Sequence, residues 1–278
     1  MPAKILVLTA RGTIGSKLVP ALLASGEQVK AATRSGTPVS TAEPVAFDYE
    51  HPSAIVAALA GVDRIYAVMP VGHTDPYQLL KPVLARAAER GVKIVLQTAI
   101  GVDADDITPY RGLEIYVQST GTPYVFLRPN WFADNFRRFW LGSIHSGELE
   151  LPAGDGKTSF IDARDIADCA ARVLTTSDFD NRAFTLTGPQ ALSYAEAVAI
   201  LSRVLGRQII YRPIDDEAFI ELLKAAGAPE DYAGYMATLF RSVREGRVAV
   251  VTGDVEELTG HPARSLETYV RDNAAAFS

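Results

Sequence analysis

The sequence predicts an α/β fold: a doubly wound parallel sheet with a smaller C-terminal α/β lobe. Short apolar runs alternate with helical segments over residues 4–128, a glycine-bearing loop follows the first run, and the rhythm changes after Arg128. Strand–helix repeats favour right-handed crossovers and parallel strands. We therefore expect a first domain over residues 1–130 and an elaboration over residues 131–278, parts of which return to the sheet.

Composition excludes several classes of protein. The 278 residues are 48% apolar and 22% charged, as in ordinary globular proteins, and the net charge is −6 without a basic cluster. We therefore expect no nucleic-acid partner. No apolar stretch approaches the ~20 residues of a membrane span, and the first strand follows directly on Met-Pro-Ala-Lys, so we expect neither a membrane span nor a signal peptide. The single cysteine, Cys169, and the scattered His51, His73, His145 and His261 show no metal-ligand spacing, which predicts a cytoplasmic protein without a metal.

The strands of the first domain are expected at apolar runs without polar alternation, which is typical of strands covered on both faces. These runs are Lys4–Thr9, Gln28–Thr33, Val45–Phe47, Arg64–Met69, Val92–Thr98 and Tyr124–Leu127. Between the last runs, Leu80, Val83, Leu84, Ala87 and Ala88 form one helical stripe that ends at Gly91.

After Arg128 the chain becomes aromatic and irregular, and a glycine-rich loop, LPAGDGKTS, follows. A further helix is expected where Ile166, Ala170, Val173 and Leu174 share a face, with Asp165 as its cap. Ser193 and Glu196 predict a capping box before the next helix, and residues 215–245 are also expected to be helical.

The loop after the first strand reads Thr9-Ala10-Arg11-Gly12-Thr13-Ile14-Gly15. Small residues at a helix N-terminus let backbone amides approach a phosphate, which favours dinucleotide binding. Thr9 stands where the first of three glycines is usual, and it is acceptable there if the turn stays in the β region. The alternative is a nucleotide-like loop that binds nothing.

Two arginines indicate which dinucleotide is bound. The second strand ends Thr33-Arg34-Ser35 without the acid that holds the ribose 2′-OH in NAD-binding folds. Arg11 in the loop and Arg34 would suit a 2′-phosphate, so we expect NADP as the cofactor, with NADPH preferred over NADH. The alternative is a pair of solvated surface arginines.

Several segments together resemble the NmrA-like branch of the atypical short-chain dehydrogenase/reductases over nearly the whole chain. They are ILVLTARGTIGSKLVPALLASGEQVKAATRS, ALAGVDRIYAVMP, LRPNWFADNF, AGDGKTSFIDARDIADCAARVL and the tail GRVAVVTGDVEELTGHPARSLETYV. Relatives in that family include NADPH-dependent quinone and dye reductases, ergot-alkaloid reductases and a dinucleotide-binding regulator. The resemblance implies a Rossmann-type sheet, an NAD(P) site and a C-terminal lobe that forms the substrate pocket over the nicotinamide.

The resemblance also implies positions for cofactor contacts. The phosphate loop matches at Thr9, Arg11, Gly12, Thr13, Ile14 and Gly15, the 2′-phosphate position at Arg34, the adenine position at Asp48, the ribose position at Met69 and Pro70, and the end of the fifth strand at Thr98. Asp48 has an alternative role as a turn or capping acid before His51.

The chain departs from the main short-chain dehydrogenases at their Tyr-x-x-x-Lys pair, whose lysine lowers the tyrosine pKa. After the fifth strand this chain has Tyr110 followed four positions later by Glu114, and its one Tyr-x-x-x-Lys, Tyr77 to Lys81, lies on another helix. Tyr110 is the best remaining proton donor and our catalytic candidate. Arg111 and Glu114 are expected to form a solvated helix face.

The substrate pocket is expected at Asn130, Trp131, Phe132 and Asn135, with the aromatic rings stacking on a flat acceptor and an asparagine polarising its carbonyl. The alternative for these residues is ordinary core. The sequence thus favours an NADPH-dependent reductase of a small conjugated acceptor such as a quinone or iminium ion, acting as a monomer or homodimer. A dinucleotide-binding sensor and a non-redox isomerase or cyclase remain alternatives.

Overall fold

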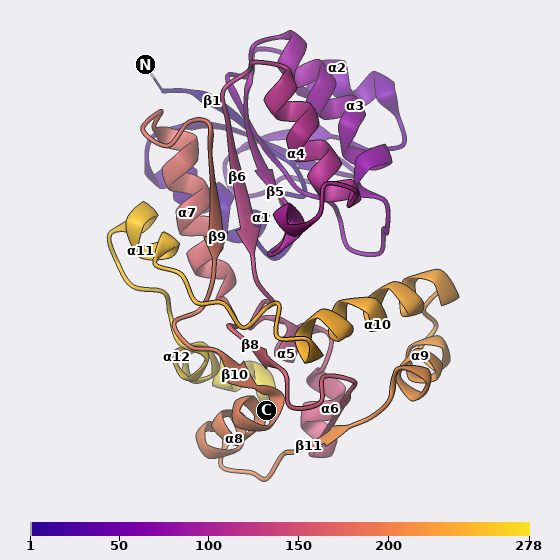
Figure 1. Cartoon of the computed structure of the whole chain (residues 1–278). Helices are drawn as coiled ribbons and strands as arrows, with labels where there is room; N and C mark the ends of the chain where they lie inside the picture. Colours follow the sequence, from indigo (N-terminus) through magenta and orange to yellow (C-terminus); the bar gives the residue numbers. More distant parts are fainter. Residues whose placement is uncertain (1) are drawn as a thin grey trace. The chain divides into compact units, whose positions relative to one another are not determined.

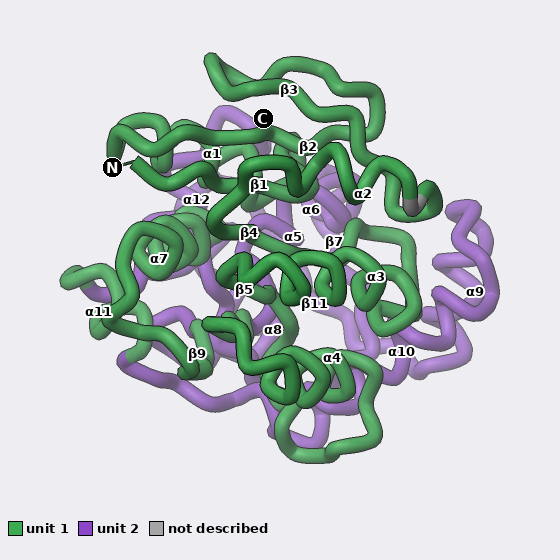
Figure 2. The backbone as a smooth tube through the Cα atoms, turned by 90° about the horizontal axis from the view of Figure 1, so that it is seen from above, with its two compact units in different colours: residues 1–129, 163–186, 254–261 green, residues 130–162, 187–253, 262–278 purple. Residues whose placement is uncertain are grey.

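The computed structural model describes residues 2–278, which divide into two compact units. Unit 1 comprises the chain up to Pro129 together with residues 163–186 and 254–261, and unit 2 comprises residues 130–162, 187–253 and 262–278 (Figure 2). Each unit therefore contains segments that lie far apart in the sequence.

Unit 1 is built on a parallel sheet of seven strands in the described chain, with the order β3-β2-β1-β4-β5-β6-β9 (Figure 1). The strands are β1 (Lys4–Val7), β2 (Gln28–Thr33), β3 (Glu43–Ala46), β4 (Arg64–Ala67), β5 (Lys93–Gln97), β6 (Tyr124–Pro129) and β9 (Arg182–Leu186). Every apolar run expected to be a strand overlaps one of them, so the predicted doubly wound sheet is confirmed.

Helices cover both faces of this sheet. The helices of unit 1 are α1 (Gly15–Ala24), α2 (Pro52–Ala58), α3 (Pro76–Glu89), the 3₁₀ turn η1 (Val102–Ala104), α4 (Pro109–Ser119), α7 (Ala163–Thr175) and α11 (Asp254–Thr259). Helix α7 packs against α1 and α11 on one face, whereas α2, α3 and α4 cover the other (Figure 2). In the predicted stripe of α3 the first four residues are fully or almost fully buried and Ala88 is half-buried. The chain leaves this helix through Gly91 at a φ of +66°.

The strand order reverses between β1 and β4, since the chain builds outward through β2 and β3 before returning to the other side of β1. In open α/β sheets ligands bind outside the carboxyl ends of the strands at this reversal. The loop between β1 and α1 therefore occupies the expected position of a binding site.

Unit 2 contains two small two-stranded sheets and an aromatic core. Strand β7 (Glu148–Leu151) pairs in parallel with β11 (Ile210–Pro213), and β8 (Lys157–Thr158) pairs antiparallel with β10 (Leu192–Ser193). Its helices are α5 (Asn135–Arg138), α6 (Leu141–Ser146), α8 (Tyr194–Leu205), α9 (Asp216–Ala225), α10 (Glu230–Arg244), α12 (Leu266–Asp272) and the 3₁₀ turn η2 (Ala274–Phe277). The predicted capping box at the start of α8 is present: the backbone amide of Glu196 donates to Ser193 Oγ at 3.1 Å, and the Ser193 amide donates to the Glu196 carboxylate at 2.8 Å.

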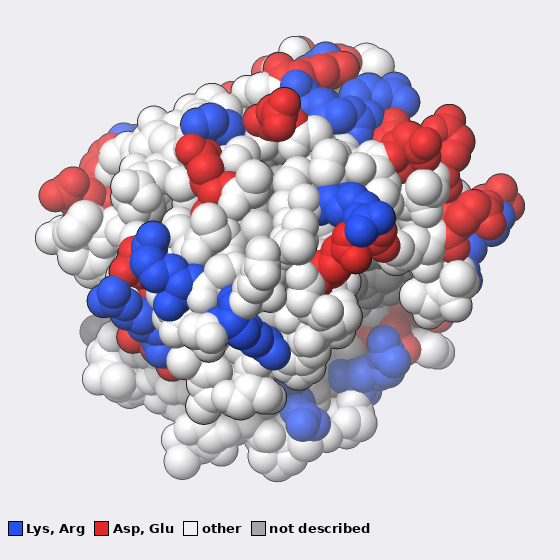
Figure 3. Space-filling model, turned by 90° about the horizontal axis from the view of Figure 1, so that it is seen from below, with Lys and Arg blue, Asp and Glu red and all other residues white. Residues whose placement is uncertain are grey.

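The surface carries charges of both signs. On the face in Figure 3, basic and acidic side chains are both present, several of them side by side, and uncharged surface lies between these groups. Among the described residues, no helix is both long and apolar enough to span a bilayer.

Candidate functional site

The loop between β1 and α1 is held between the neighbouring strands by backbone hydrogen bonds. The Leu8 amide donates to the Tyr66 carbonyl at 3.1 Å, and the Ala10 amide donates to the Ala32 carbonyl at 3.0 Å. Inside the loop the Gly12 amide donates to the Thr9 carbonyl at 2.7 Å. The loop is therefore a tight turn fixed to β2 and β4.

Thr9 does not stay in the β region. Its φ is +51°, in the left-handed region, so the condition under which a threonine is acceptable in this turn is not met. The Thr9 hydroxyl donates to the Leu8 carbonyl at 2.7 Å. A β-branched residue in this region is strained by about 1–3 kcal/mol, and the tight turn after β1 imposes that strain.

Gly12 and Gly15 allow close backbone packing in this turn. A Cβ on Gly15 would lie 2.4 Å from the Thr9 carbonyl oxygen and 2.7 Å from the Ala10 Cα, and a Cβ on Gly12 would lie 3.0 Å from the Thr9 oxygen. The first of these distances is impossible for real atoms without movement of the backbone. Gly15 is therefore required by the loop's own geometry, and a side chain at Gly12 would be in tight contact with the Thr9 carbonyl.

A cavity of about 610 Å³ opens beside this loop at the carboxyl ends of the strands, within the usual range of small-molecule sites. Its lining contains six of the predicted cofactor residues: Thr9, Arg11, Gly12, Arg34, Asp48 and Pro70. Thr13, Ile14, Gly15, Met69 and Thr98 are not among the lining residues found in the described chain. The cavity is also lined by Phe47, Tyr49 and Glu50, which were not predicted from the sequence, although the apolar run ending at Phe47 leads to this edge of the sheet.

The two arginines of the cavity are exposed and available for a ligand. Within residues 2–278 Arg11 makes no hydrogen bond or ion pair, and Arg34 makes no hydrogen bond. The Thr33 and Ser35 hydroxyls beside Arg34 also line the cavity. Ser35 Oγ lies 2.6 Å from Thr37 Oγ1, which orients one of these hydroxyls.

Asp48 lines the cavity and also stabilises the turn after β3. The Glu50 backbone amide donates to its carboxylate at 3.2 Å, and His51 Nδ1 lies 3.4 Å from it. These contacts, the Glu50 amide first, lower the pKa of Asp48, and the charge of Arg34 acts in the same direction. Asp48 therefore stays ionised near neutral pH, and both of its expected roles fit its position.

Tyr110, the predicted proton donor, lies half-buried in the first turn of α4, where it packs against the core. It is close enough to Tyr49 and Tyr66 to raise the pKa of both phenols, although burial is the larger cause for each. The Tyr49 hydroxyl donates to the Val68 carbonyl at 2.9 Å, and Tyr66 donates to Gln97 Oε1. Three phenols thus gather near the carboxyl ends of β4 and β5.

Glu114 is not on a solvated face, and this expectation is wrong. Its side chain is fully buried, with hydrogen bonds from Arg128 Nε at 3.0 Å, Arg128 Nη2 at 2.7 Å, Arg111 Nη1 at 3.1 Å and the Thr98 hydroxyl at 2.9 Å. Arg128 also pairs with Asp103 at 2.5 Å. Partners from β6, from α4 and from the residue that follows β5 compensate for the burial of the carboxylate. The role of Arg128 was not predicted from the sequence, although its position at the end of a buried strand was an available signal.

The chain's Tyr77–Lys81 pair lies where α3 packs against α4. The Lys81 ammonium lies 4.7 Å from the centre of the Tyr77 ring and 5.3 Å from that of Tyr116 on α4. A Cβ on Gly112 would be 3.3 Å from the Tyr77 ring, so this pair packs α3 against α4.

In unit 2 the two predicted pocket asparagines differ. Both N–H groups of the Asn130 amide are engaged, with Ser159 Oγ at 2.6 Å and the Val248 carbonyl at 2.8 Å, and its oxygen accepts from the Trp131 amide at 2.8 Å. Asn130 therefore has no donor left to polarise a substrate carbonyl, which corrects that part of its expected role. The half-buried Asn135 side chain makes no hydrogen bond within residues 2–278.

Of the two predicted pocket aromatics, Trp131 belongs to the aromatic core of unit 2. The Trp131 ring, half-buried, lies 4.7 Å from that of Phe240 and 6.3 Å from that of Trp140 between centres. Phe132, also half-buried, forms an isolated parallel bridge with Ile161. Trp131 is thus supported from within unit 2 and keeps part of its surface exposed.

The sheet of unit 1, its reversal of strand order and its glycine loop define the chain as a Rossmann-type α/β protein. The chain belongs to the NmrA-like family, whose model matches residues 1–270. The resemblance inferred from the motifs is therefore confirmed.

Three known proteins illustrate the relationship. The chain is 35% identical over 283 residues to an NAD(P)H azoreductase of Xenophilus azovorans, with 98% of this chain and 99% of that protein covered. The structure of a Citrobacter triphenylmethane reductase complexed with NADP(H) matches with a TM-score of 0.81 and 26% identity, over 95% of this chain and 98% of that chain. An NADPH-dependent quinone oxidoreductase of Escherichia coli matches in fold, with a TM-score of 0.84 and 22% identity, over 96% of this chain and 99% of that chain.

Proposed function

We propose that this protein is an NADPH-dependent reductase that transfers hydride to a small, planar, conjugated acceptor such as a quinone, an azo compound or an iminium ion. The observation that carries the proposal is the pair Arg11 and Arg34, which lines the cavity beside the glycine loop without a carboxylate bound to either guanidinium. The full-length similarity to an azoreductase and to a dye reductase supports the same class of reaction.

The residues of the cavity fit NADPH. The close turn over Gly12 and Gly15 exposes the amide end of α1 to a pyrophosphate, as phosphate-binding helix N-termini do. Arg11 and Arg34 would hold the 2′-phosphate by charge-assisted hydrogen bonds, and Asp48 would face the adenosine. When bound, NADPH supplies the hydride, so the protein's own part is orientation, exclusion of water and proton supply.

The acceptor class is proposed from unit 2. The partly exposed Trp131 ring, supported by Phe240, offers a flat surface for an aromatic or quinoid ring. Asn135 is the asparagine that can donate to an acceptor oxygen, whereas Asn130 keeps the chain in place through Ser159 and Val248. Asn135→Ala should therefore lower kcat/KM more than it lowers stability, and Asn130→Ala should do the reverse.

Proton transfer after the hydride step is assigned to Tyr110 or to water. The buried Glu114–Arg128 pair fixes the helix that carries Tyr110, and it does not supply the charge that a lysine gives to the usual catalytic tyrosine. Tyr110→Phe should lower kcat with acceptors that need a proton. The same variant should reduce acceptors that need no proton after hydride transfer at an unchanged rate.

The decisive experiment follows NADPH absorbance with panels of quinones and azo dyes, together with calorimetry of NADPH and NADH. Arg34→Ala should weaken NADPH about ten- to a hundredfold and leave NADH unchanged, because one charge-assisted bond contributes about 1.5–3 kcal/mol. Arg86→Ala is the matched control, since Arg86 is an exposed arginine paired with Glu89 on α3. Equal weakening of both nucleotides by Arg34→Ala would contradict the proposed phosphate contact.

A second candidate function is a dinucleotide-binding sensor. It is favoured by Glu114, which stands four residues after Tyr110, where a Tyr-x-x-x-Lys pair would have its lysine. The Glu114 carboxylate is instead buried in hydrogen bonds with Thr98 and Arg128. Tight NADPH binding with no turnover on any acceptor would support the sensor over the reductase.

A further inference from the structure

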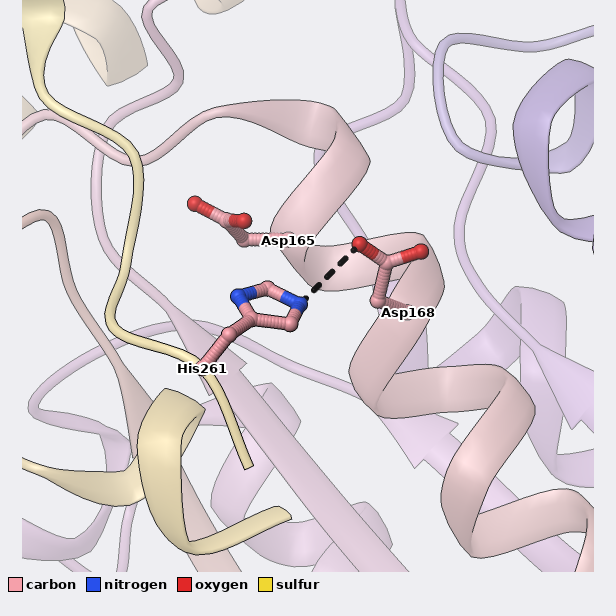
Figure 4. Close-up of side chains that lie close together, drawn as sticks. All are labelled: Asp165, Asp168 and His261. Carbon is pink, nitrogen blue, oxygen red and sulfur yellow. Dashed lines mark ion pairs between the residues drawn. The ribbon is translucent and has the colours of Figure 1, made fainter. Parts of the chain in front are cut away.

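A cluster of three side chains lies in unit 1 and is formed by residues distant in the sequence. Asp165 and Asp168 lie one turn apart on α7, and His261 is the last residue of the segment 254–261, just after α11 (Figure 4). The His261 imidazole lies between the two carboxylates, with Nε2 at 3.6 Å from an oxygen of Asp168. One ligand atom from each residue lies within 4.8 Å of the other two.

The location of Asp165 differs from the sequence expectation. It was expected to cap a helix, yet it lies inside the first turn of α7 and is fully buried. The side chains of Asp168 and His261 are 36% and 41% exposed. The cluster therefore has one buried carboxylate at its inner side and two groups that water can reach.

Other carboxylates lie near the cluster. The carboxylates of Asp165, Asp168 and Asp254 all add to the effect of burial in raising the pKa of the neighbouring Cys169 thiol. Burial, and then the charge of Glu257, raises the pKa of Asp254. Glu257 forms an ion pair with Arg182 at 2.6 Å, and the carboxylates of Asp165 and Asp168 lie close to the His261 imidazole.

We propose that Asp165, Asp168 and His261 form a binding site for a divalent transition-metal ion. One imidazole nitrogen and two carboxylate oxygens are ligands that Zn²⁺ accepts, and three protein ligands leave a further coordination position for water. Spacing among the histidines alone does not reveal the site, because two ligands are acids and the third comes from a remote segment. The ion would tie α7 to the end of the 254–261 segment.

The site is tested with Zn²⁺ and Co²⁺ on the untagged, full-length protein. One Zn²⁺ per chain should bind after dialysis against a chelator, and Zn²⁺ at a hundredfold excess over Kd should raise Tm by about 5 °C. Co²⁺ should give a visible absorption band that Zn²⁺ displaces. Asp168→Asn and His261→Gln should each remove the Tm rise and the band.

The matched control is His51→Gln, because His51 is also paired with an aspartate, Asp48, but the pair belongs to no three-ligand group in the described chain. This variant should respond to Zn²⁺ as the unaltered protein does. If His261→Gln does not fold, Asp168→Asn and the Co²⁺ band of the unaltered protein still decide the matter. No Tm rise with millimolar Zn²⁺, or an equal rise in Asp168→Asn, would overturn the site; neither result bears on NADPH binding.

Discussion

The two edges of the sheet in unit 1 use their cations differently. At the amino edge, Lys30 donates to the Ala57 carbonyl at the end of α2 at 3.1 Å, Lys93 donates to the Thr176 carbonyl just beyond α7 at 2.7 Å, and Arg64 donates to the Leu174 carbonyl of α7. At the carboxyl edge, Arg11 and Arg34 are exposed and donate no hydrogen bond to any residue of 2–278.

The difference follows from the direction of the helices. Each crossover helix places its carbonyl end at the amino edge of the sheet, where a cation satisfies it, and its amide end at the carboxyl edge, where an anion is favoured. Cations at the carboxyl edge have no such partner in the fold. The cations of the amino edge are therefore structural, and Arg11 and Arg34 beside the β1–α1 loop are available for a ligand. Arg128, at the carboxyl end of β6, is instead held by the buried Glu114 carboxylate.

The largest expected effect comes from the packing of the carboxyl edge. Gly15→Ala places a Cβ 2.4 Å from the Thr9 carbonyl oxygen, so the loop must move. We expect a loss of about 3 kcal/mol or more in the free energy of unfolding, together with loss of nucleotide binding. Urea denaturation and calorimetry provide the measurements.

The control for that change is Gly234→Ala in α10, where a Cβ would meet nothing within 4 Å. It should stabilise the protein by about 0.5–1 kcal/mol through helix propensity. If both alanine variants had the same stability, close backbone packing would not explain Gly15.

The next effect tests the amino edge. Lys93→Met leaves the Thr176 carbonyl and the Asp180 carboxylate without their cation. We expect a loss of about 2 kcal/mol in the free energy of unfolding, with NADPH affinity unchanged. Arg34→Ala should show the opposite pattern, so a Lys93→Met protein that is stable but binds NADPH poorly would break the comparison between the edges.

A pH dependence should come from the phenols near the carboxyl edge. Burial raises the pKa of Tyr49 and Tyr66, so the folded protein keeps protons that the unfolded chain releases above about pH 10. Their contribution to stability is complete below pH 10 and falls by about 1.4 kcal/mol per residue for each pH unit above it. Tyr49→Phe should make the decline in urea midpoint between pH 9.5 and 11 shallower, and an unchanged slope would contradict the burial of that phenol.

The smallest effect concerns the strained turn. Thr9→Gly removes the strain of a φ of +51° but adds freedom to the unfolded chain, which leaves a net gain of about 1 kcal/mol. Thermal unfolding measures it. A loss of stability would show that the hydroxyl bond from Thr9 to Leu8 outweighs the strain.

The strands of unit 1, the helix ending at Gly91 and the capping box at Ser193 could be predicted from the sequence because each rests on a local pattern. The two arginines of the cavity could be predicted because Arg34 directly follows β2 and Arg11 lies in the loop after β1. Both positions are at the carboxyl edge of the sheet. The burial of Glu114 could not, because it depends on Arg128 and Thr98, which only the fold brings to α4. The engaged amide of Asn130 likewise depends on the distant Val248.

The division of unit 1 into three sequence segments determines when that unit can be complete during synthesis. Strand β9, which pairs with β6, and helix α7, whose terminal carbonyl binds Arg64, are translated after the first part of unit 2, and residues 254–261 are translated later still. When only the first 130 residues have left the ribosome, the nascent sheet therefore ends at an unpaired β6, and α1 lacks the helix α7 that later packs against it. A protein truncated after residue 130 should therefore aggregate or depend on chaperones, whereas the whole chain should fold without assistance.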